Sequence, residues 1–314
     1  MTAPPLSGHR VLIALGGNAM TSPEGGASPA DQIEAIGRAA RAIADVVATG
    51  AEVVLTHGNG PQVGNLLVKN EMAAKVVPPV PLDWCVAQTQ GTIGAMLLDA
   101  VDHCLAASGV ARPVVAVVTR TLVDPEDPGF ANPTKPIGRY LTEAEARVLL
   151  GHGQVWQDRG PRGWRRLVAS PEPIEIIDAP AVVTLIDAGF LVVAAGGGGI
   201  PVVRKDGMIQ GVEAVIDKDL SAAVLARTVG ATTLVIATDV DAARVHFGTE
   251  RERSLGAVTV DELRRYEAEG HFASGSMGPK VDAACRFVEG GGERAVITSL
   301  DRIADPAAGT VVTT

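Results

Sequence analysis

Residues 10–18 read RVLIALGGN, an apolar run that ends in two glycines and an asparagine. A second run, EVVLTH at 52–57, is followed directly by GNGP. Both runs are nearly continuous in Val, Leu, Ile and Ala, as expected of strands that are buried on both faces of a parallel sheet. These two stretches therefore predict strands whose carboxyl ends carry glycine loops.

The same pattern recurs along the whole chain, with longer amphipathic stretches between the apolar runs. Strands are expected near residues 11–15, 52–56, 113–119, 190–195, 232–237 and 294–298. Regular alternation of short strands with helices is typical of α/β proteins. The sequence thus predicts a mainly parallel sheet that is covered by helices on both faces.

Helix boundaries are marked by capping residues. Ser28 precedes Pro29 and stands three residues before Asp31, and Gly50 closes the same helix. Further starts are expected at Thr142 with Glu145, at Thr259 with Glu262, and at Asp83, whose helix should end at Gly109. The sequence also places a helix start at Lys218 and another just after Lys280.

The chain of 314 residues is long enough for one large α/β domain or two modest ones. We expect a single domain over 1–314, because no flexible linker or repeat is apparent. From about 120 to 172 the composition shifts to Pro, Gly and Arg, with the turn-like stretch RGPRG at 159–163. This segment is interpreted as an inserted, protruding subdomain of short strands and loops.

Composition excludes several classes of partner. A net charge of −9 argues against nucleic acid or an anionic membrane surface as the main partner, and ten aromatic residues are too few for base-stacking platforms. Cys85, Cys104 and Cys285 form no CxxC pair, which argues against a disulfide framework or a zinc knuckle. We expect a cytoplasmic protein without membrane or nucleic-acid partners.

Four of the expected strands end in loops of small residues, which should meet at one edge of the sheet. Without a Cβ atom, glycine lets backbone N–H groups approach a phosphate closely. The alternative is that each loop is only a tight turn. A Walker-type P-loop is excluded because no lysine follows a glycine. The loops are Gly16-Gly17-Asn18, His57 to Pro61, Gly196 to Gly199 and Thr238 to Asp241.

Lysine is rare in this chain, with only six residues among 27 cations. Lys135, Lys218 and Lys280 stand in tight Pro-, Asp- and Gly-rich contexts, where a compact point charge is useful. Phosphoryl transfer requires positioning and charge neutralisation rather than a covalent nucleophile. The three lysines therefore favour a phosphoryl-transfer site, whereas His57 is interpreted as a residue that orders its loop.

Six motifs together resemble the carbamate kinases of the amino-acid kinase superfamily, from about residue 10 to the C-terminus. They are IALGGNA at 13–19, HGNGPQVGN at 57–65, NPTKPIG at 132–138, AAGGGGIP at 194–201, VEAVIDKDL at 212–220 and GSMGPK at 275–280. The resemblance implies an open three-layer αβα sandwich, a homodimer and the reversible reaction of ATP with carbamate to give ADP and carbamoyl phosphate. It also implies a role in arginine or purine-derived catabolism, with Mg²⁺ carried by the nucleotide and no metal site formed by the protein.

The resemblance assigns roles to residues one motif at a time. Lys218 and Lys280 would flank the transferred phosphoryl group, Asp219 would hold both lysines, and Lys135 would reach over the site from the subdomain. The phosphoryl and carbamate groups would be lined by Gly16, Gly17, Asn18, Gly58, Asn59 and Gly60. The nucleotide would contact Gly196, Gly197, Gly198, Asp217, Thr238, Asp239, Met277 and Gly278.

Three positions depart from the family pattern. Ala14 stands where many superfamily relatives have a lysine, whose charge Lys218 would supply. Arg139 replaces a proline expected after PTKPIG, and Arg244 replaces an aromatic residue expected near the nucleotide, so that subdomain conformation and base stacking are the affected properties. The alternatives are a related acyl-phosphate or phosphonate kinase and a nucleotide-binding regulator without activity.

Overall fold

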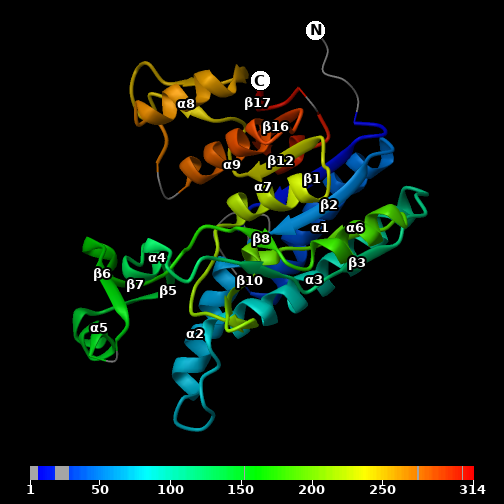
Figure 1. Cartoon of the computed structure of the whole chain (residues 1–314). Helices are drawn as coiled ribbons and strands as arrows, with labels where there is room; N and C mark the ends of the chain where they lie inside the picture. Colours follow the sequence, from blue (N-terminus) through cyan, green and yellow to red (C-terminus); the bar gives the residue numbers. More distant parts are fainter. Residues whose placement is uncertain (1–5, 18–27, 152, 274–275, 306) are drawn as a thin grey trace.

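A large central sheet organises the molecule, described here from a computed structural model that covers residues 6–17, 28–151, 153–273, 276–305 and 307–314 (Figure 1). Its strands are β1 (Arg10–Leu15), β2 (Glu52–His57), β3 (Val114–Ala116), β9 (Leu191–Val193), β12 (Thr233–Thr238), β15 (Ala257–Thr259), β16 (Arg294–Ser299) and β17 (Thr310–Thr313). They lie in the order β15, β17, β16, β12, β1, β2, β9, β3. Every neighbouring pair is parallel except β16 with β17.

Strand β1 lies in the middle of this sheet and is apolar on both faces. Val11, Ile13 and Leu15 belong to the core on one face of the sheet, and Leu12 and Ala14 belong to the core on the other. All five side chains are fully buried. A continuous apolar run is therefore what a strand between two helical layers requires.

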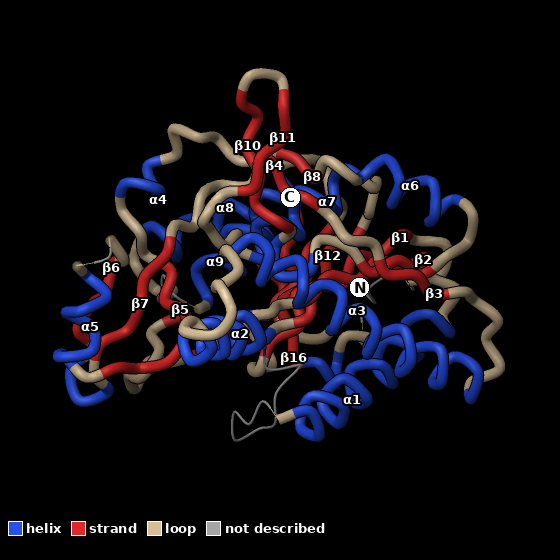
Figure 2. The backbone as a smooth tube through the Cα atoms, turned by 90° about the horizontal axis from the view of Figure 1, so that it is seen from below, coloured by secondary structure: helices blue, strands red, loops and turns tan. Residues whose placement is uncertain are grey.

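Helices cover both faces, and the predicted three-layer αβα sandwich is confirmed (Figure 2). On one face lie α1 (Pro29–Ala48) and α3 (Leu82–Ala107). On the other lie α6 (Ala179–Asp187), α7 (Lys218–Thr228), α8 (Val260–Ala268) and α9 (Met277–Glu289). Among the described residues, every helix is too short or too polar to cross a membrane.

The capping signals are confirmed in most places. Ser28, Thr142 and Thr259 each form a capping box with the acidic residue three positions later, at the starts of α1, α5 (Glu143–Leu150) and α8. The start expected at Asp83 was wrong, because α3 begins at Leu82 and Asp83 lies in its first turn. An acidic side chain there interacts favourably with the helix dipole without being the cap.

A second sheet of short strands was not predicted. It contains β4 (Arg120–Leu122), β8 (Glu175–Ile176), β10 (Ile200–Lys205) and β11 (Met208–Gly211), in the order β11, β10, β4, β8. Strands β10 and β11 form a projecting hairpin (Figure 2). Its turn residues Asp206 and Gly207 have φ of 51° and 76°, and the Asp-Gly pair is the usual sequence signal for such a turn.

A small antiparallel sheet protrudes beside the central one (Figure 1). It consists of β5 (Lys135–Leu141), β7 (Trp164–Val168) and β6 (Val155–Asp158), with α5 packed on it and α4 (Pro128–Ala131) before it. We call residues 135–151 and 153–168 the arm. Because β4 joins the second sheet instead, the boundaries 120–172 for the inserted segment stay a prediction.

Candidate active site

A cleft of about 990 Å³ lies at the carboxyl ends of β1, β2, β12 and β16. Since these strands are parallel, their loops meet at one edge of the sheet, where open α/β proteins bind their ligands. Asn18 lies outside the described residues. The expected site residues that line the cleft are Gly16, Gly17, Gly58, Asn59, Gly60, Lys135, Gly197, Asp217, Lys218, Asp219, Thr238, Asp239, Met277 and Lys280.

Glycine allows close backbone packing where the loop after β1 meets the loop after β2 and the end of β12. A Cβ atom on Gly58 would lie 3.2 Å from the backbone nitrogen of Gly17, and one on Gly16 would lie 2.9 Å from the carbonyl oxygen of Ala237. These two loops therefore pack backbone against backbone. Asn59, just before α2 (Gly60–Ala73), is buried and donates from Nδ2 to Thr89 Oγ1 at 2.9 Å.

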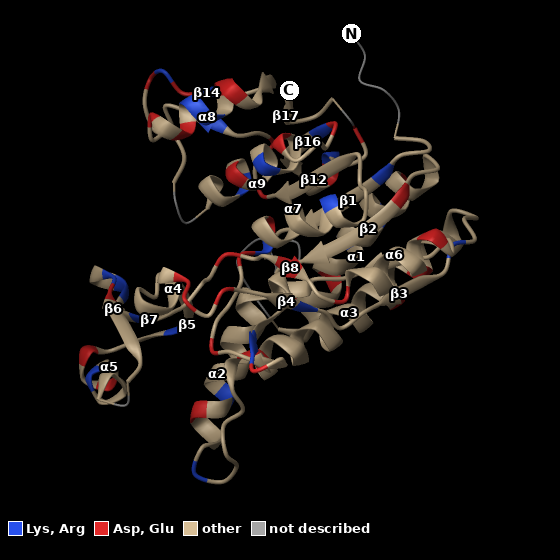
Figure 3. Cartoon of the chain, viewed as in Figure 1, with Lys and Arg blue, Asp and Glu red and all other residues tan. Residues whose placement is uncertain are grey.

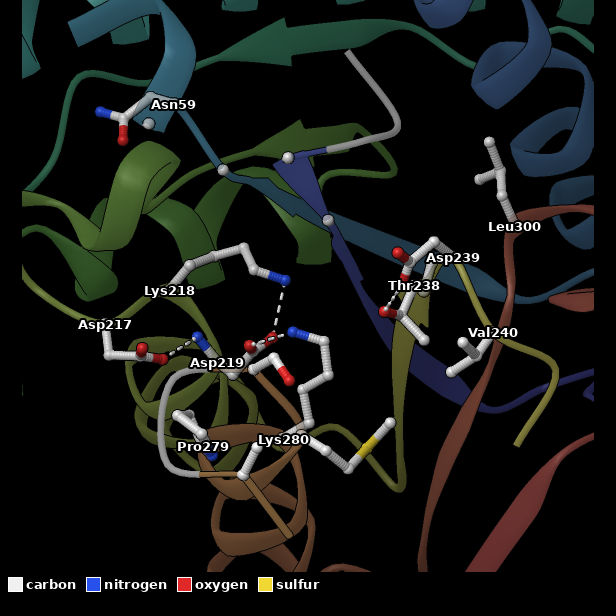
Figure 4. A pocket seen from close by; sticks show the side chains of 18 of the residues that line it. Asn59, Asp217, Lys218, Asp219, Thr238, Asp239, Val240, Pro279, Lys280 and Leu300 are labelled. Carbon is white, nitrogen blue, oxygen red and sulfur yellow. Dashed lines mark hydrogen bonds and ion pairs between the residues drawn. The ribbon is translucent and has the colours of Figure 1, made fainter. Parts of the chain in front are cut away.

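Two lysines converge on one carboxylate in the cleft (Figure 4). Lys218 Nζ lies 2.6 Å from Asp219 Oδ1, and Lys280 Nζ lies 3.0 Å from Asp219 Oδ2. Lys218 and Asp219 come from the first turn of α7, and Lys280 comes from the first turn of α9, which begins at Met277 and not after Lys280 as expected. We call these three residues the Lys–Asp–Lys cluster.

The cluster is largely shielded from water. The exposed fractions of the side chains are 11% for Lys218, 5% for Asp219 and 16% for Lys280. Burial raises the pKa of Asp219, but the charges and hydrogen bonds of the two lysines outweigh burial and hold that pKa well below its usual range. Asp219 is therefore an anion whose charge keeps two buried cations in place.

Lys218 retains capacity to bind a further acceptor. Its Nζ and Asp219 Oδ1 are within ion-pair distance, yet neither atom has a partner at the angle of a hydrogen bond among the described residues. Burial lowers the pKa of Lys218, the nearby Lys280 lowers it further, and Asp219 opposes both effects. A buried ammonium with unused N–H groups beside a cleft is well suited to an anionic ligand.

Lys135 reaches the same region from the arm. Its Nζ lies 2.6 Å from Asp217 Oδ2, while Asp217 Oδ1 accepts a hydrogen bond from the backbone N–H of Asp219 at 2.9 Å. Asp217 is thus both the N-cap of α7 and the partner of Lys135. The Lys135 side chain is 40% exposed, so that the arm is held by a contact that water and salt can reach.

His57 is the last residue of β2 and is fully buried. Its Nδ1 donates to the carbonyl oxygen of Gly58 at 2.9 Å. Burial lowers the pKa of His57 to about 4, and the nearby charge of Lys218 adds to this effect. A neutral imidazole that binds its own loop agrees with the ordering role expected from the sequence.

Three residues expected to contact the nucleotide do not line the cleft. They are Gly196, Gly198 and Gly278. A Cβ atom on Gly196 would lie 2.3 Å from the ring of His57, and one on Gly198 would lie 2.6 Å from the carbonyl oxygen of Ile216. Gly196 and Gly198 of the loop after β9 therefore pack against His57 and Ile216, whereas Gly197 of the same loop lines the cleft.

Several lining residues were not anticipated, because they become neighbours only through the tertiary fold. Arg38 comes from α1, and Phe247, His271 and Phe272 come from the segments between β13 (Arg244–Val245) and α9. Leu300 and Asp301 follow β16. Leu300 and Asp301 could have been found from the general rule that ligands bind beyond the carboxyl ends of strands.

The two arginines that depart from the family pattern, Arg139 and Arg244, both form ion pairs. Arg139 Nε on β5 lies 3.4 Å from Glu71 Oε2 on α2, which ties the arm to the main body. Arg244 Nη1 lies 2.7 Å from Glu252 Oε1, while Phe247 lines the cleft three residues later. The aromatic side chain expected at position 244 thus has a candidate substitute close by in the sequence.

The cleft residues can be compared with the ligands that a metal ion requires. Within the described parts of the chain, no three His, Cys, Asp or Glu side chains are grouped so as to hold a metal ion. Four aspartates line the cleft, namely Asp217, Asp219, Asp239 and Asp301, and Asp239 Oδ1 accepts a hydrogen bond from Thr238 Oγ1 at 3.0 Å. This donor set fits Mg²⁺ that arrives already bound to nucleotide phosphates, since that ion often takes only one or two carboxylates.

Comparisons with known proteins agree with this geometry. The model of the amino acid kinase family matches residues 9–299. The carbamate kinase of Thermococcus kodakarensis is 50% identical over 305 residues, which cover 96% of each chain. The carbamate kinase-like protein YahI of Escherichia coli is 46% identical over 295 residues, covering 92% of this chain and 93% of YahI.

A solved structure of high similarity is carbamate kinase from Giardia lamblia bound to AMP-PNP, with a TM-score of 0.93, 43% identity and 98% of each chain covered. N-acetylglutamate synthase from Neisseria gonorrhoeae, at 16% identity and a TM-score of 0.54, shares the fold alone. This chain belongs to the carbamate kinase family, within the amino acid kinase family.

Proposed function

We propose that this protein is an ATP:carbamate phosphotransferase, which converts ATP and carbamate reversibly into ADP and carbamoyl phosphate. The observation that carries the proposal is the buried Lys–Asp–Lys cluster beside a cleft lined by glycine loops. Its two cations and one anion leave a net positive charge where a phosphoryl group would pass. Relatives named carbamate kinase, similar over nearly the whole chain, support carbamate as the acceptor.

In the proposed reaction a carbamate oxygen attacks the γ-phosphorus of ATP in line with the leaving group. The new P–O bond forms as the bond from phosphorus to the β,γ-bridging oxygen breaks, and ADP leaves with that electron pair. Negative charge gathers on the equatorial oxygens and on the leaving oxygen during transfer. Lys218 and Lys280, fixed by Asp219, would neutralise this charge without reorganising, because they are already buried and paired.

The other residues would bind and orient the substrates. The loops at Gly16–Gly17 and Gly58–Gly60 would line the phosphoryl and carbamate groups, and Lys135 would close over them from the arm. Thr238, Asp239, Met277 and the neighbouring Phe247 would contact the nucleotide. Mg²⁺ would enter with the nucleotide and neutralise part of the phosphate charge.

Some properties follow from the family resemblance alone. We propose that the protein is a cytoplasmic homodimer that works in arginine or purine-derived catabolism, in the direction of ATP synthesis. Light scattering of the purified protein tests the oligomeric state. Growth of a deletion strain on arginine, citrulline or allantoin tests the pathway.

The activity is tested by ATP formation from ADP, Mg²⁺ and carbamoyl phosphate, with acetyl phosphate as the competing donor. Carbamate kinase activity predicts efficient use of carbamoyl phosphate and poor use of acetyl phosphate. Preference for acetyl phosphate would instead favour a related acyl-phosphate kinase. Calorimetry that shows tight ADP binding without transfer from either donor would favour a non-catalytic regulator.

A further inference from the structure

A second hollow, of about 310 Å³, lies on the arm outside the cluster that the proposed reaction uses. It is lined by Pro136, Tyr140, Arg159, Arg162 and Arg165. Pro136 also lines the large cleft, so that the two cavities adjoin along β5. The size is at the lower end of the range for small-molecule sites.

The three arginines bring positive charge together without compensation. Among the described residues, no carboxylate lies within ion-pair distance of Arg159, Arg162 or Arg165, whereas other arginines of the arm, such as Arg147 and Arg166, do contact glutamates. The chain as a whole carries a net charge of −9. Three unpaired guanidinium groups around one hollow repel one another, and a bound anion would remove that repulsion.

Tyr140 and Arg165 give the hollow a defined wall. Arg165 Nη1 donates to Tyr140 Oη at 3.2 Å, and its guanidinium carbon lies 4.9 Å from the centre of the Tyr140 ring. Hydrogen bonding to Arg165 and then to Arg162 lowers the pKa of Tyr140. Arg165 Nε is buried and has no hydrogen-bond partner among the described residues.

The chemistry of this wall selects the ligand. Guanidinium groups present several N–H donors in a planar fork that matches the oxygens of phosphate. The Tyr140 hydroxyl adds a further donor, and nothing acidic among the lining residues would repel an anion. We propose that the hollow formed by Tyr140, Arg159, Arg162 and Arg165 is a binding site for a phosphate dianion, either free or as the phosphoryl group of a small molecule.

A bound dianion would connect three parts of the arm. Tyr140 belongs to β5, Arg159 and Arg162 belong to the tight turn around Gly160–Arg162, and Arg165 belongs to β7. Basic segments near β6 at the outer end of the arm are visible in Figure 3. Because Lys135 begins the same β5 strand, occupancy of this hollow would stiffen the strand that carries Lys135 to the large cleft.

The test measures binding of inorganic phosphate by calorimetry at constant ionic strength, with glycerol 3-phosphate as a parallel probe for a phosphorylated small molecule. All measurements use a Lys280→Met background, which should weaken phosphate binding in the large cleft. The Lys280→Met protein is compared with the same protein carrying Arg159→Gln and Arg162→Gln. Both positions are exposed and lie in a turn, so they should tolerate substitution. Arg204→Gln, an exposed arginine of β10 without an ion-pair partner among the described residues, is the matched control.

We expect about one equivalent of phosphate or glycerol phosphate to bind in the Lys280→Met background, and at least about ten-fold weaker binding after Arg159→Gln/Arg162→Gln. Arg204→Gln should have no effect, and Arg162→Lys should weaken binding less than the glutamine pair. Thermal unfolding verifies that each variant is folded. Absence of binding in the Lys280→Met background, or equal binding with and without the two arm arginines, would overturn the proposal.

Discussion

The Lys–Asp–Lys cluster and the arm both supply lysines to one cleft, but they hold them in opposite ways. Lys218 and Lys280 are mostly buried and share Asp219, and they stand on the first turns of two helices anchored in the core. Lys135 stands on a small sheet that protrudes from the body, and its ion pair with Asp217 is partly exposed. The first two cations are therefore fixed before the substrate arrives, whereas the third depends on a contact that solvent weakens.

This difference teaches how one cleft can combine preorganisation with access. Fixed charges lower a barrier because they need not reorganise during the reaction. A site enclosed by fixed elements on every side, however, could not admit a nucleotide. Under the proposed function, a cation on the arm would allow the cleft to open while the Lys–Asp–Lys cluster stays in position.

The largest effect is expected at the cluster. Lys218→Met or Lys280→Met should lower kcat for ATP formation from carbamoyl phosphate by about 10²–10³, because each removes a preorganised charge contact. Lys205→Met, an exposed lysine beside the β10–β11 turn, is the matched control and should be near normal. The melting temperature of each variant verifies that it is folded. A near-normal kcat in either cluster variant would show that the substituted lysine does not act in the mechanism.

The next largest effect concerns stability and is expected at His57, the buried last residue of β2. Its pKa is about 4 in the folded protein and near its ordinary value of 6.5 when unfolded, so that below about pH 6.5 the unfolded state binds a proton that the folded state excludes. The free energy of unfolding should fall as the pH drops from about 7 to 4.5, by on the order of 2–3 kcal/mol from this group. Urea unfolding of wild type and His57→Gln measures it.

The His57→Gln protein serves as the internal reference, because Asp219 and the other carboxylates titrate alike in both proteins. Its loss of stability between the two pH values should be smaller than that of wild type by the stated amount. Equal losses in the two proteins would mean that His57 is not held neutral by burial.

A smaller effect is expected on the arm. Lys135→Met should lower kcat/KM by roughly ten-fold, because it removes one charged contact that is partly screened by water. The loss relative to wild type should shrink as sodium chloride is raised, whereas the loss in Lys280→Met should not. Steady-state kinetics at low and high salt decide this. A Lys135→Met defect as large and as salt-independent as that of Lys280→Met would end the distinction between fixed and movable lysines.

The smallest effect is expected at the aromatic wall of the cleft. Phe247→Ala should raise KM for ADP by about 3–10-fold with little change in kcat, because an aromatic contact with a base contributes about 1 kcal/mol of binding. Phe247→Tyr is the matched variant and should keep the wild-type KM. A fall in kcat without a change in KM would place Phe247 outside the nucleotide site.

The strands and the glycine loops could be predicted because their signals are local. An apolar run such as VLIAL before Gly16-Gly17 predicts both a buried strand and the tight loop at its end, and Ser28, Thr142 and Thr259 mark helix starts by their own hydrogen bonds. The convergence of Lys218 and Lys280 on Asp219 was predicted through the family resemblance. The burial of these two lysines could not be predicted from the sequence, because it depends on how α7 and α9 pack together.

Other features depend on packing between distant segments. The loop from Gly196 to Gly198 resembles a phosphate loop in sequence, yet Gly196 and Gly198 lie against His57 and Ile216, and Gly197 lines the cleft. Phe247 and Phe272 reach the cleft from segments without a motif. The stretch at 159–163 was identified as a turn, but its meeting with Tyr140 depends on the irregular register between β5 and β7. Local patterns carry no information of this kind.

The central claim is that Lys218 and Lys280 act as one unit on one migrating phosphoryl group, and a double-mutant cycle on kcat tests it most directly. Residues that act as a unit have strongly non-additive effects. We predict that Lys218→Met/Lys280→Met is slowed by a factor close to that of the slower single variant. A double variant slowed by the product of the two single factors would show that the lysines act independently and would contradict the account.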